Sequence, residues 1–407
     1  MSRVAKNTFW LMLAQIGGLF IPLIELPVLA RALGQQGYGQ VLYALGLALT
    51  ASVFVEFGFN FSAARSVVKV KEDRARLAQL VTNVLAAKLL LSSVVILAIG
   101  VLIFFSMGAT TIPHYWFIWV SLFLVAFGFS PLWYYVGIER LILPSLLDLA
   151  LRSTGLLFTI TLVSSPEHAQ RVLIIQATVG ILNTFIPTFI MLRQTGLGRI
   201  NLNGTWQVIR DSWELFLYKG AQSIMGSIAS TLLGFLGGAR AVGSFVPAEK
   251  LIRAASGLAI PALNAAFPHL VKLQRDSERT AKKLVTIALV VISIATILFS
   301  ITTVFASAWV VNIVFGPGYQ DAINLLKILV WVVPFRINSM ILAVLWFIPT
   351  GKERIASRVM IANISLICML AILLIPTLGG LGMTLAFLVA EIIMFLVLIF
   401  FFCRNRQ

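Results

Sequence analysis

Charged side chains inside long apolar stretches are the residues of this sequence with the clearest capacity for chemistry. A charge in hydrocarbon costs at least a few kcal/mol, so such a residue generally faces a polar cavity or a partner. Acidic residues at this depth are Glu25, Glu56, Asp148, Glu249 and Glu391. Basic residues at this depth are Lys88, Arg152, Lys219, Lys250, Arg253, Lys327 and Arg336. The excess of basic residues indicates a cavity of weakly positive potential, which suits an anionic head group such as a phosphate.

Two groups of these charges have helical spacing. Asp148 and Arg152 are four residues apart and share one face of a helix, and Glu249, Lys250 and Arg253 lie within about 100° of arc. Internal pairing of Asp148 with Arg152 and of Glu249 with Arg253 remains open. Such pairing would cover only part of the charge of the second group, because Lys250 remains.

Other kinds of site have no support in the sequence. Cys368 and Cys403 both lie in apolar runs and are interpreted as small core residues, not as a disulfide or metal site. The three histidines are scattered, and no phosphate-binding loop of the Walker type occurs. We therefore expect no catalytic residue, no metal and no cofactor.

The elements that position these charges are membrane-spanning helices. Of the 407 residues, 59% are hydrophobic and 11% are charged, where a soluble domain has roughly a quarter charged residues. Composition predicts an all-α integral membrane protein with about twelve helices of roughly 20 residues. The first apolar run is interpreted as a retained helix and not as a signal peptide. The predicted spans are 8–33, 40–64, 78–106, 114–137, 142–164, 170–192, 213–237, 241–269, 283–309, 321–349, 355–376 and 378–402.

The basic residues outside these spans predict the orientation of the chain. The termini and the even-numbered connections carry 21 of the 31 basic residues, whereas the opposite side carries only Arg31, Arg171 and Arg240. Because short loops rich in Lys and Arg stay in the cytoplasm, both termini are expected to be cytoplasmic. The same asymmetry accounts for most of the net charge of +16, so no nucleic-acid partner is expected.

The sequence repeats at half its length. Gly34 and Gly39 have the same spacing as Gly238 and Gly243, which lie 204 positions further on. The segments 68–73 and 271–276 correspond, as do 137–140 and 351–354. This repeat predicts two six-helix bundles, residues 1–193 and 213–407, related by a pseudo-two-fold axis along the membrane normal and joined by a cytoplasmic linker, 194–212.

Three motifs resemble those of a known family. They are Leu29–Gly34 with Tyr38-Gly39, the run Trp133–Glu139, and Val242–Phe245 followed by Ala248–Ala254. They are similar to motifs of the polysaccharide transporters, or O-antigen-type flippases, in the multidrug/oligosaccharidyl-lipid/polysaccharide exporter superfamily. The resemblance covers essentially the whole chain.

The resemblance implies a function, a shape and roles for the buried charges. Such proteins move undecaprenyl-pyrophosphate-linked oligosaccharide from the cytoplasmic to the periplasmic leaflet of the bacterial inner membrane, and their bundles form a V around a central cavity. Lys250 is the first candidate for a pyrophosphate contact and Arg253 the second, followed by Arg336, Arg152, Lys88 and Arg31. Coupling to H⁺ or Na⁺ would use Glu25, Glu56, Asp148, Glu249 or Glu391. Membrane lipid is an expected partner, and a polysaccharide polymerase with its chain-length machinery is a further one.

Two alternative functions remain. A multidrug exporter of the same superfamily would need an acidic cavity for organic cations, which the basic excess disfavours. A membrane polymerase or glycosyltransferase generally needs a long loop outside the membrane. The longest candidate loops here, 65–77, 193–212 and 270–282, contain no Asp-x-Asp pair. We therefore expect a transporter and not an enzyme.

Overall fold

The computed structural model describes residues 3–105 and 112–404, which form helices joined by short turns. Among the basic residues used above, Arg406 lies outside the described residues, and the side chains of Arg3, Lys6 and Lys219 are not described. The helices divide between two compact units, Met1–Ala239 (unit 1) and Arg240–Gln407 (unit 2). We describe each unit by itself.

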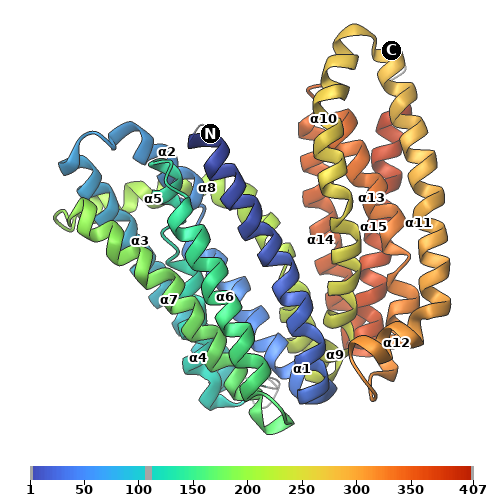
Figure 1. Cartoon of the computed structure of the whole chain (residues 1–407), viewed down its shortest axis with the longest axis horizontal. Coiled ribbons are helices and arrows are strands. Elements are labelled where there is room, and N and C mark those ends of the chain that lie inside the picture. Colours follow the sequence, from blue (N-terminus) through green and yellow to red (C-terminus); the bar gives the residue numbers. More distant parts are fainter. Residues whose placement is uncertain (1–2, 106–111, 405–407) are drawn as a thin grey trace. The chain divides into compact units, whose positions relative to one another are not determined.

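Unit 1 contains the helices up to the start of α9, and α9 continues into unit 2 (Figure 1). Unit 1 comprises α1 (Arg3–Glu56), α2 (Phe59–Val70), α3 (Arg74–Phe105), α4 (Phe117–Gly128), α5 (Leu132–Gly137), α6 (Ile142–Leu162), α7 (Ala169–Thr195) and α8 (Leu202–Met225). Unit 2 comprises the later part of α9 (Ile228–Gly257), α10 (Ala259–Asp276), α11 (Glu278–Val314), α12 (Gln320–Leu329), α13 (Val332–Leu342), α14 (Glu353–Leu378) and α15 (Gly380–Arg404). Short 3₁₀ turns precede α4 and α7, and a π-helical segment, Ala343–Phe347, follows α13.

The first part of α9 belongs to unit 1 because it packs closely on α1. The Thr50 hydroxyl lies within hydrogen-bonding distance of the hydroxyls of Ser227 (2.8 Å) and Thr231 (2.9 Å). A Cβ at Gly46 or Gly234 would collide with the neighbouring helix, so these glycines allow the close approach. The boundary between two bundles that we predicted at 194–212 was based on the sequence repeat and not on contacts between helices. It stays a prediction.

Among the described residues, ten helical stretches are long and apolar enough to cross a membrane. The chain is therefore a multi-pass membrane protein. Two stretches, Phe20–Val70 and Ile228–Asp276, have 51 and 49 residues, about 75 Å if straight, against a hydrocarbon core of about 30 Å. α1 and α9, which form most of these stretches, each contain one glycine with a non-helical backbone, Gly34 (φ 66°, ψ 174°) and Gly238 (φ 78°, ψ 173°). A count of twelve spans requires the chain to turn at each of these glycines, on the side of the membrane opposite the termini. This count stays a proposal.

The two halves of the sequence also interrupt their helices in the same order. α1 and α2 are separated at Phe57 and Gly58, and α9 and α10 are separated at Leu258. α4 and α5 are separated around Pro131, and α12 and α13 are separated at Val330 and Trp331. These breaks recur about 200 positions apart, and together with the matched backbone of Gly34 and Gly238 they support the internal repeat.

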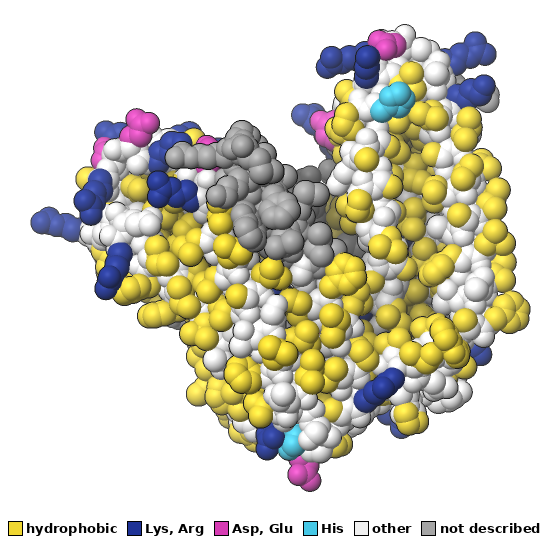
Figure 2. Space-filling model, in the orientation of Figure 1, with side chains coloured by type: hydrophobic (Ala, Val, Ile, Leu, Met, Phe, Trp, Pro, Cys, Tyr) yellow, Lys and Arg dark blue, Asp and Glu magenta, His cyan; other side chains and the backbone are white. Residues whose placement is uncertain are grey.

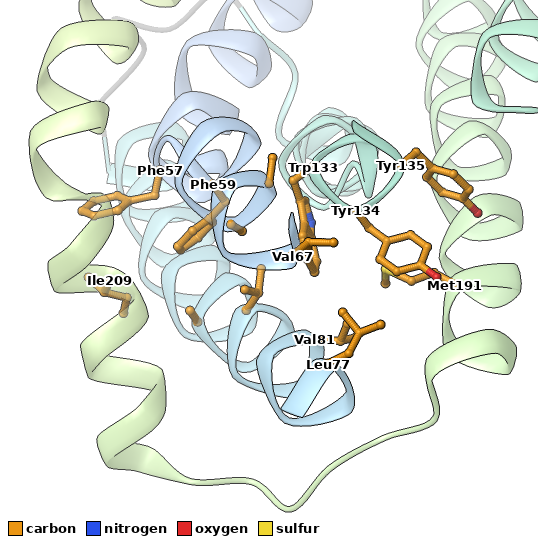
Figure 3. Close-up of a cluster of buried hydrophobic side chains, with 14 of the residues drawn as sticks. Phe57, Phe59, Val67, Leu77, Val81, Trp133, Tyr134, Tyr135, Met191 and Ile209 are labelled. Carbon is orange, nitrogen blue, oxygen red and sulfur yellow. The ribbon is translucent and has the colours of Figure 1, made fainter. Parts of the chain in front are cut away.

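A cluster of buried aromatic and aliphatic side chains holds the broken helices of unit 1 together (Figure 3). Trp133 and Phe59 are fully buried, and the rings of Phe57 and Phe216 stack at 4.4 Å. The Tyr135 hydroxyl donates to the carbonyl of Pro187 at 2.7 Å. The motif Trp133-Tyr134-Tyr135 is therefore part of the packed core that joins α5 to α7.

Most of the remaining surface is apolar. Figure 2 shows hydrophobic side chains along the flanks of the helices in each unit, with Lys and Arg mainly near helix ends. On α11, for example, Ile294, Leu298 and Phe305 are exposed. Such a surface is stable in hydrocarbon and not in water, as expected for a membrane protein.

Candidate functional site

A cavity of about 350 Å³ lies within unit 1. Its walls come from α4, α6 and α7, with Gly18 of α1. The apolar part of the lining includes Phe123 and Phe127, and the polar part is supplied by Ser130, Ser145, Asp148, Arg152, Gln176, Asn183 and Thr184. A mainly apolar cavity with a few convergent polar groups is the usual form of a ligand site.

Asp148 and Arg152 form an ion pair in the wall of this cavity. The Arg152 Nε donates to Asp148 Oδ1 at 2.8 Å, and the Asn183 amide donates to the same oxygen at 2.7 Å. The Asp148 and Arg152 side chains remain 22% and 35% exposed. Because partly exposed charges in a membrane span do not face lipid, these groups favour a water-filled or ligand-filled space.

Glu25 is connected to the same cavity through an amide. Gln176, which lines the cavity, donates from Nε2 to Glu25 Oε1 at 2.8 Å, and the Thr159 hydroxyl donates to that oxygen at 3.4 Å. α1, α6 and α7 thus each contribute one polar group to a single contact. The hydrogen bond from Gln176 thus links Glu25 of α1 to the lining of the cavity.

Lys88 lies behind this cavity and not in it. Its side chain is fully buried, and its ammonium donates to the carbonyls of Gly128 (2.8 Å) and Ser130 (3.0 Å). These carbonyls lie at the break between α4 and α5, where helical hydrogen bonds are lost. Ser130 also lines the cavity, so in this structure Lys88 holds one wall of the cavity in place. The predicted substrate contact by Lys88 stays untested.

Glu56 caps a helix in this structure. Its carboxylate accepts from the backbone amides of Asn60 (2.9 Å) and Gly58 (3.4 Å) at the start of α2. The chain turns there through Phe57 and Gly58, both with positive φ (46° and 74°). These contacts satisfy amides that a helix N-terminus leaves without partners.

In unit 2, Glu249 and Arg253 form a two-point ion pair on α9. The Arg253 Nε and Nη2 lie 3.0 and 2.9 Å from the two carboxylate oxygens of Glu249. The Glu249 side chain is 4% exposed, whereas that of Arg253 is 47% exposed. Lys250, the next residue, is half-buried, and α9 continues as a helix through Pro247. The pairing left open by the sequence is therefore present.

A second ion pair in unit 2 joins α13 to α15. The Arg336 Nε donates to Glu391 Oε1 at 2.8 Å, and the two side chains are 16% and 3% exposed. The Arg336 guanidinium also lies 5.9 Å from the centre of the Phe387 ring. Sequence spacing could not predict this pair because its members are 55 residues apart.

Arg31 is exposed, lies three residues before Gly34, and does not line the cavity of unit 1. The sequence analysis missed Thr159, Gln176 and Asn183, since it considered only charged residues. A signal was available, because Gln176 and Asn183 are seven residues apart on α7 and share a face.

Among the residues that the structure describes, no group of three His, Cys, Asp or Glu could hold a metal ion.

Comparisons with known proteins relate the whole chain to transporters of saccharides. The sequence profile of the family described as "Polysaccharide biosynthesis protein" matches residues 4–274. A "Putative O-antigen transporter" of Shigella dysenteriae is 26% identical over 395 residues, 96% of this chain and 98% of the relative. A protein of the same description from Escherichia coli (strain K12) is 23% identical over 410 residues, 98% of this chain and 97% of the relative.

Solved structures show the same fold at low sequence identity. A "Lipid II flippase MurJ, inward closed conformation" aligns with a TM-score of 0.66 and 15% identity, over 97% of this chain and 87% of that chain. An inward-facing multidrug resistance MATE family transporter of the MOP superfamily aligns with a TM-score of 0.66 and 16% identity, over 96% of both chains. The resemblance found in the sequence motifs is thereby confirmed.

Proposed function

The chain belongs to the polysaccharide biosynthesis protein family, and from this premise we propose that it is a lipid-linked oligosaccharide flippase. The proposed substrate is an undecaprenyl-pyrophosphate-linked repeat unit of O-antigen type. It would move from the cytoplasmic to the periplasmic leaflet of the inner membrane. The observation that carries the proposal is the end-to-end match to relatives described as O-antigen transporters.

The polar interior of unit 1 supports movement of a hydrophilic head group. A sugar pyrophosphate cannot enter hydrocarbon without replacement of its hydration, because an unpaired charge in an apolar medium is prohibitively costly. The cavity around Asp148, Arg152 and Asn183 offers hydrogen-bonding groups at membrane depth. The prenyl tail would remain in lipid while the head group crosses by alternating access.

Within this proposal the basic residues have different accessibility. Lys250 remains the first candidate for a pyrophosphate contact and Arg253 the second, since Arg253 is about half exposed beside Glu249. Arg152 is partly exposed in the cavity of unit 1. Lys88 is fully buried and the Arg336 side chain is 16% exposed, so a substrate contact by either requires another conformation. Arg31 is exposed and stays a candidate contact outside this cavity.

Coupling to H⁺ or Na⁺ is a further part of the proposal. Of the acidic candidates, we select Glu25, because Gln176 of the cavity lining donates to its carboxylate. Asp148, Glu249 and Glu391 each have a basic partner, and Glu56 caps α2.

The protein would use no catalytic residue and no resident cofactor. It would supply substrate to a polysaccharide polymerase and its chain-length machinery, with both termini in the cytoplasm and twelve crossings.

The decisive experiment follows lipid-linked sugar after depletion of this protein. Complete prenyl-pyrophosphate oligosaccharide trapped on the cytoplasmic face would support the proposal. Complete, unpolymerised units on the periplasmic face would instead indicate a polymerase, and incomplete units inside would indicate a glycosyltransferase.

Complementation then locates the site. Wild-type protein should release the trapped lipid, whereas Lys250→Ala should fail to release it. Lys327→Ala is the control, because Lys327 is an exposed lysine of unit 2, and this variant should release the lipid. Equal rescue by both variants would remove Lys250 from the site without affecting the proposed transport activity.

A further inference from the structure

A second hollow of unit 1, the α2–α8 groove, lies between α2, α3 and α8 and has a volume of about 970 Å³. Its inner side is preformed, because the hydroxyls of Ser62 and Ser212 are hydrogen-bonded at 2.6 Å between α2 and α8. The Gln79 amide donates to Asn83 (3.0 Å) and to the carbonyl of Arg199 (2.6 Å). The groove is therefore a fixed feature of the packed helices, separate from the cavity described above.

One wall of the groove is basic. Arg65 and Lys69 lie one turn apart on α2, and both are exposed. Neither forms a hydrogen bond or an ion pair with another residue in the described part of the chain. Two unpaired cations side by side in a groove are a natural site for a phosphate group.

The opposite wall carries carboxylates. Asp211 and Glu214 project from α8 into the same lining, and neither has a hydrogen-bond or ion-pair partner among the described residues. Arg210 of α8 also lines the groove. Arg76 of α3 lines it too and pairs with Asp73. Among the lining residues, α2 thus presents only basic charges and α8 presents two carboxylates beside Arg210, without an ion pair between these helices. This arrangement leaves room for a ligand that carries both a phosphate and a cation.

The outer face of α8 places the groove at a membrane surface. Leu202, Trp206, Trp213 and Leu217 are spaced along one face of this helix and are 71%, 62%, 52% and 54% exposed. Tryptophan with leucine on one face of a helix is typical of the interface between lipid head groups and acyl chains. Trp206 and Trp213 also line the groove, so its opening lies at the level of lipid head groups.

We infer that the α2–α8 groove binds the phosphoethanolamine head group of a membrane phospholipid. The phosphate would lie on Arg65 and Lys69, and the primary ammonium would lie on Asp211 and Glu214. A head group with a phosphate alone would satisfy the basic wall and leave the carboxylates unpaired. This charge pattern selects a zwitterionic phospholipid over an anionic one.

Native mass spectrometry of the full chain tests the inference without any transport assay. The purified protein is equilibrated with equal amounts of phosphatidylethanolamine, phosphatidylglycerol and phosphatidylcholine, and retained lipids are counted. Wild-type protein should retain phosphatidylethanolamine in preference to both others. Arg65→Gln with Lys69→Gln should lower that retention roughly tenfold, because the phosphate loses both of its cationic partners on α2.

The acidic wall supplies the more specific test. Asp211→Asn with Glu214→Gln should abolish the preference and raise retention of phosphatidylglycerol. Lys71→Gln with Arg74→Gln, exposed basic residues near the groove but outside its lining, should change nothing.

Equal retention of the three lipids by wild-type protein, or a preference for phosphatidylglycerol, would overturn the inference. All the substituted side chains are exposed, so the variants should fold, and size-exclusion chromatography checks that they do. The result is independent of whether the protein transports oligosaccharide.

Discussion

The ammonium of Lys88 lies 3.0 Å from the carbonyl oxygen of Ser130, at the point where α4 ends and α5 has yet to begin. Unit 2 has a counterpart. The fully buried Ser300 of α11 donates to the carbonyl of Val330 at 3.2 Å, between α12 and α13. In both units the preceding long helix thus donates to a carbonyl that an interrupted helix leaves free, which is the way irregular backbone becomes tolerable in a membrane.

Removal of the Lys88 ammonium should destabilise unit 1. Lys88→Met keeps the length of the side chain but leaves the carbonyls of Gly128 and Ser130 without this donor. We expect a loss of about 1–3 kcal/mol in the free energy of unfolding, seen as a lower Tm of the purified protein. Lys71→Met, at an exposed position, is the control. Equal Tm values for the two variants would contradict the structural role of Lys88.

The Arg336–Glu391 pair should show strong non-additivity. Arg336→Leu alone leaves Glu391, whose side chain is 3% exposed, as an unpaired buried charge, and should cost about 3–5 kcal/mol. Arg336→Leu with Glu391→Leu should recover most of that loss, since a buried ion pair replaced by apolar groups is often nearly neutral. The measurement is a double-mutant cycle on thermal unfolding, and additive losses would contradict a direct interaction.

Neutral polar residues of the cavity should matter for transport more than for stability. Asn183→Leu removes the amide that donates to Asp148, and Gln176→Leu removes the amide that donates to Glu25. Each should lower the transport rate roughly tenfold, an effect of about 1.4 kcal/mol on the barrier. Transport is measured in vesicles that contain extracted lipid-linked oligosaccharide. Thr161→Val, on an exposed part of α6, serves as the control, and rates equal to that control would exclude the cavity from the substrate pathway.

Gln176→Leu also has a specific effect on coupling. If Glu25 carries the coupling ion, the variant should lose the response of transport to an imposed proton or sodium gradient before it loses transport altogether. A wild-type rate that responds to no gradient would refute coupling itself, and an unchanged response in the variant would refute the role of Gln176.

Gly34→Ala should impair folding although no atom obstructs the new methyl group. Nothing lies within 4 Å of a Cβ built at this glycine, but its φ of 66° with ψ of 174° is a conformation that essentially only glycine adopts. The expected cost is about 1–3 kcal/mol. Expression yield and Tm measure it, with Gly18→Ala as the control because Gly18 has no positive φ and open space around its Cβ. A full yield of Gly34→Ala would show that α1 can bend elsewhere.

Sequence alone predicted the membrane class and the family, because each depends on patterns that extend along the chain. The internal repeat that it also predicted is supported by the matched helix breaks. It also identified Asp148 with Arg152 and Glu249 with Arg253 as possible pairs, since both have the spacing of one helical turn. Pairs of residues on different helices have no characteristic spacing in the sequence, so they could not be predicted in this way. The Arg336–Glu391 pair, the hydrogen bonds of Lys88 and the amide that joins α7 to Glu25 all depend on which faces meet in the folded chain.

The structure also explains why helix ends were harder to predict than helices. Hydropathy placed a span at 213–237, but the chain forms α8 up to Met225 and begins α9 at Ile228. The early part of α8 presents an exposed tryptophan-containing face and a polar face, so its average hydropathy gave little indication of a helix. Amphipathic elements at a membrane surface are recognised by the periodicity of their residues and not by their mean composition.

The single-residue turns at Gly34 and Gly238 have a practical consequence for anyone who wishes to label this protein. Because each turn consists of one glycine between two helices, an epitope, a fluorophore or a protease site inserted there would have to unwind helix on both sides. Extramembrane reporters belong instead at the connections near Lys71 and Asp276, where the helices already stop.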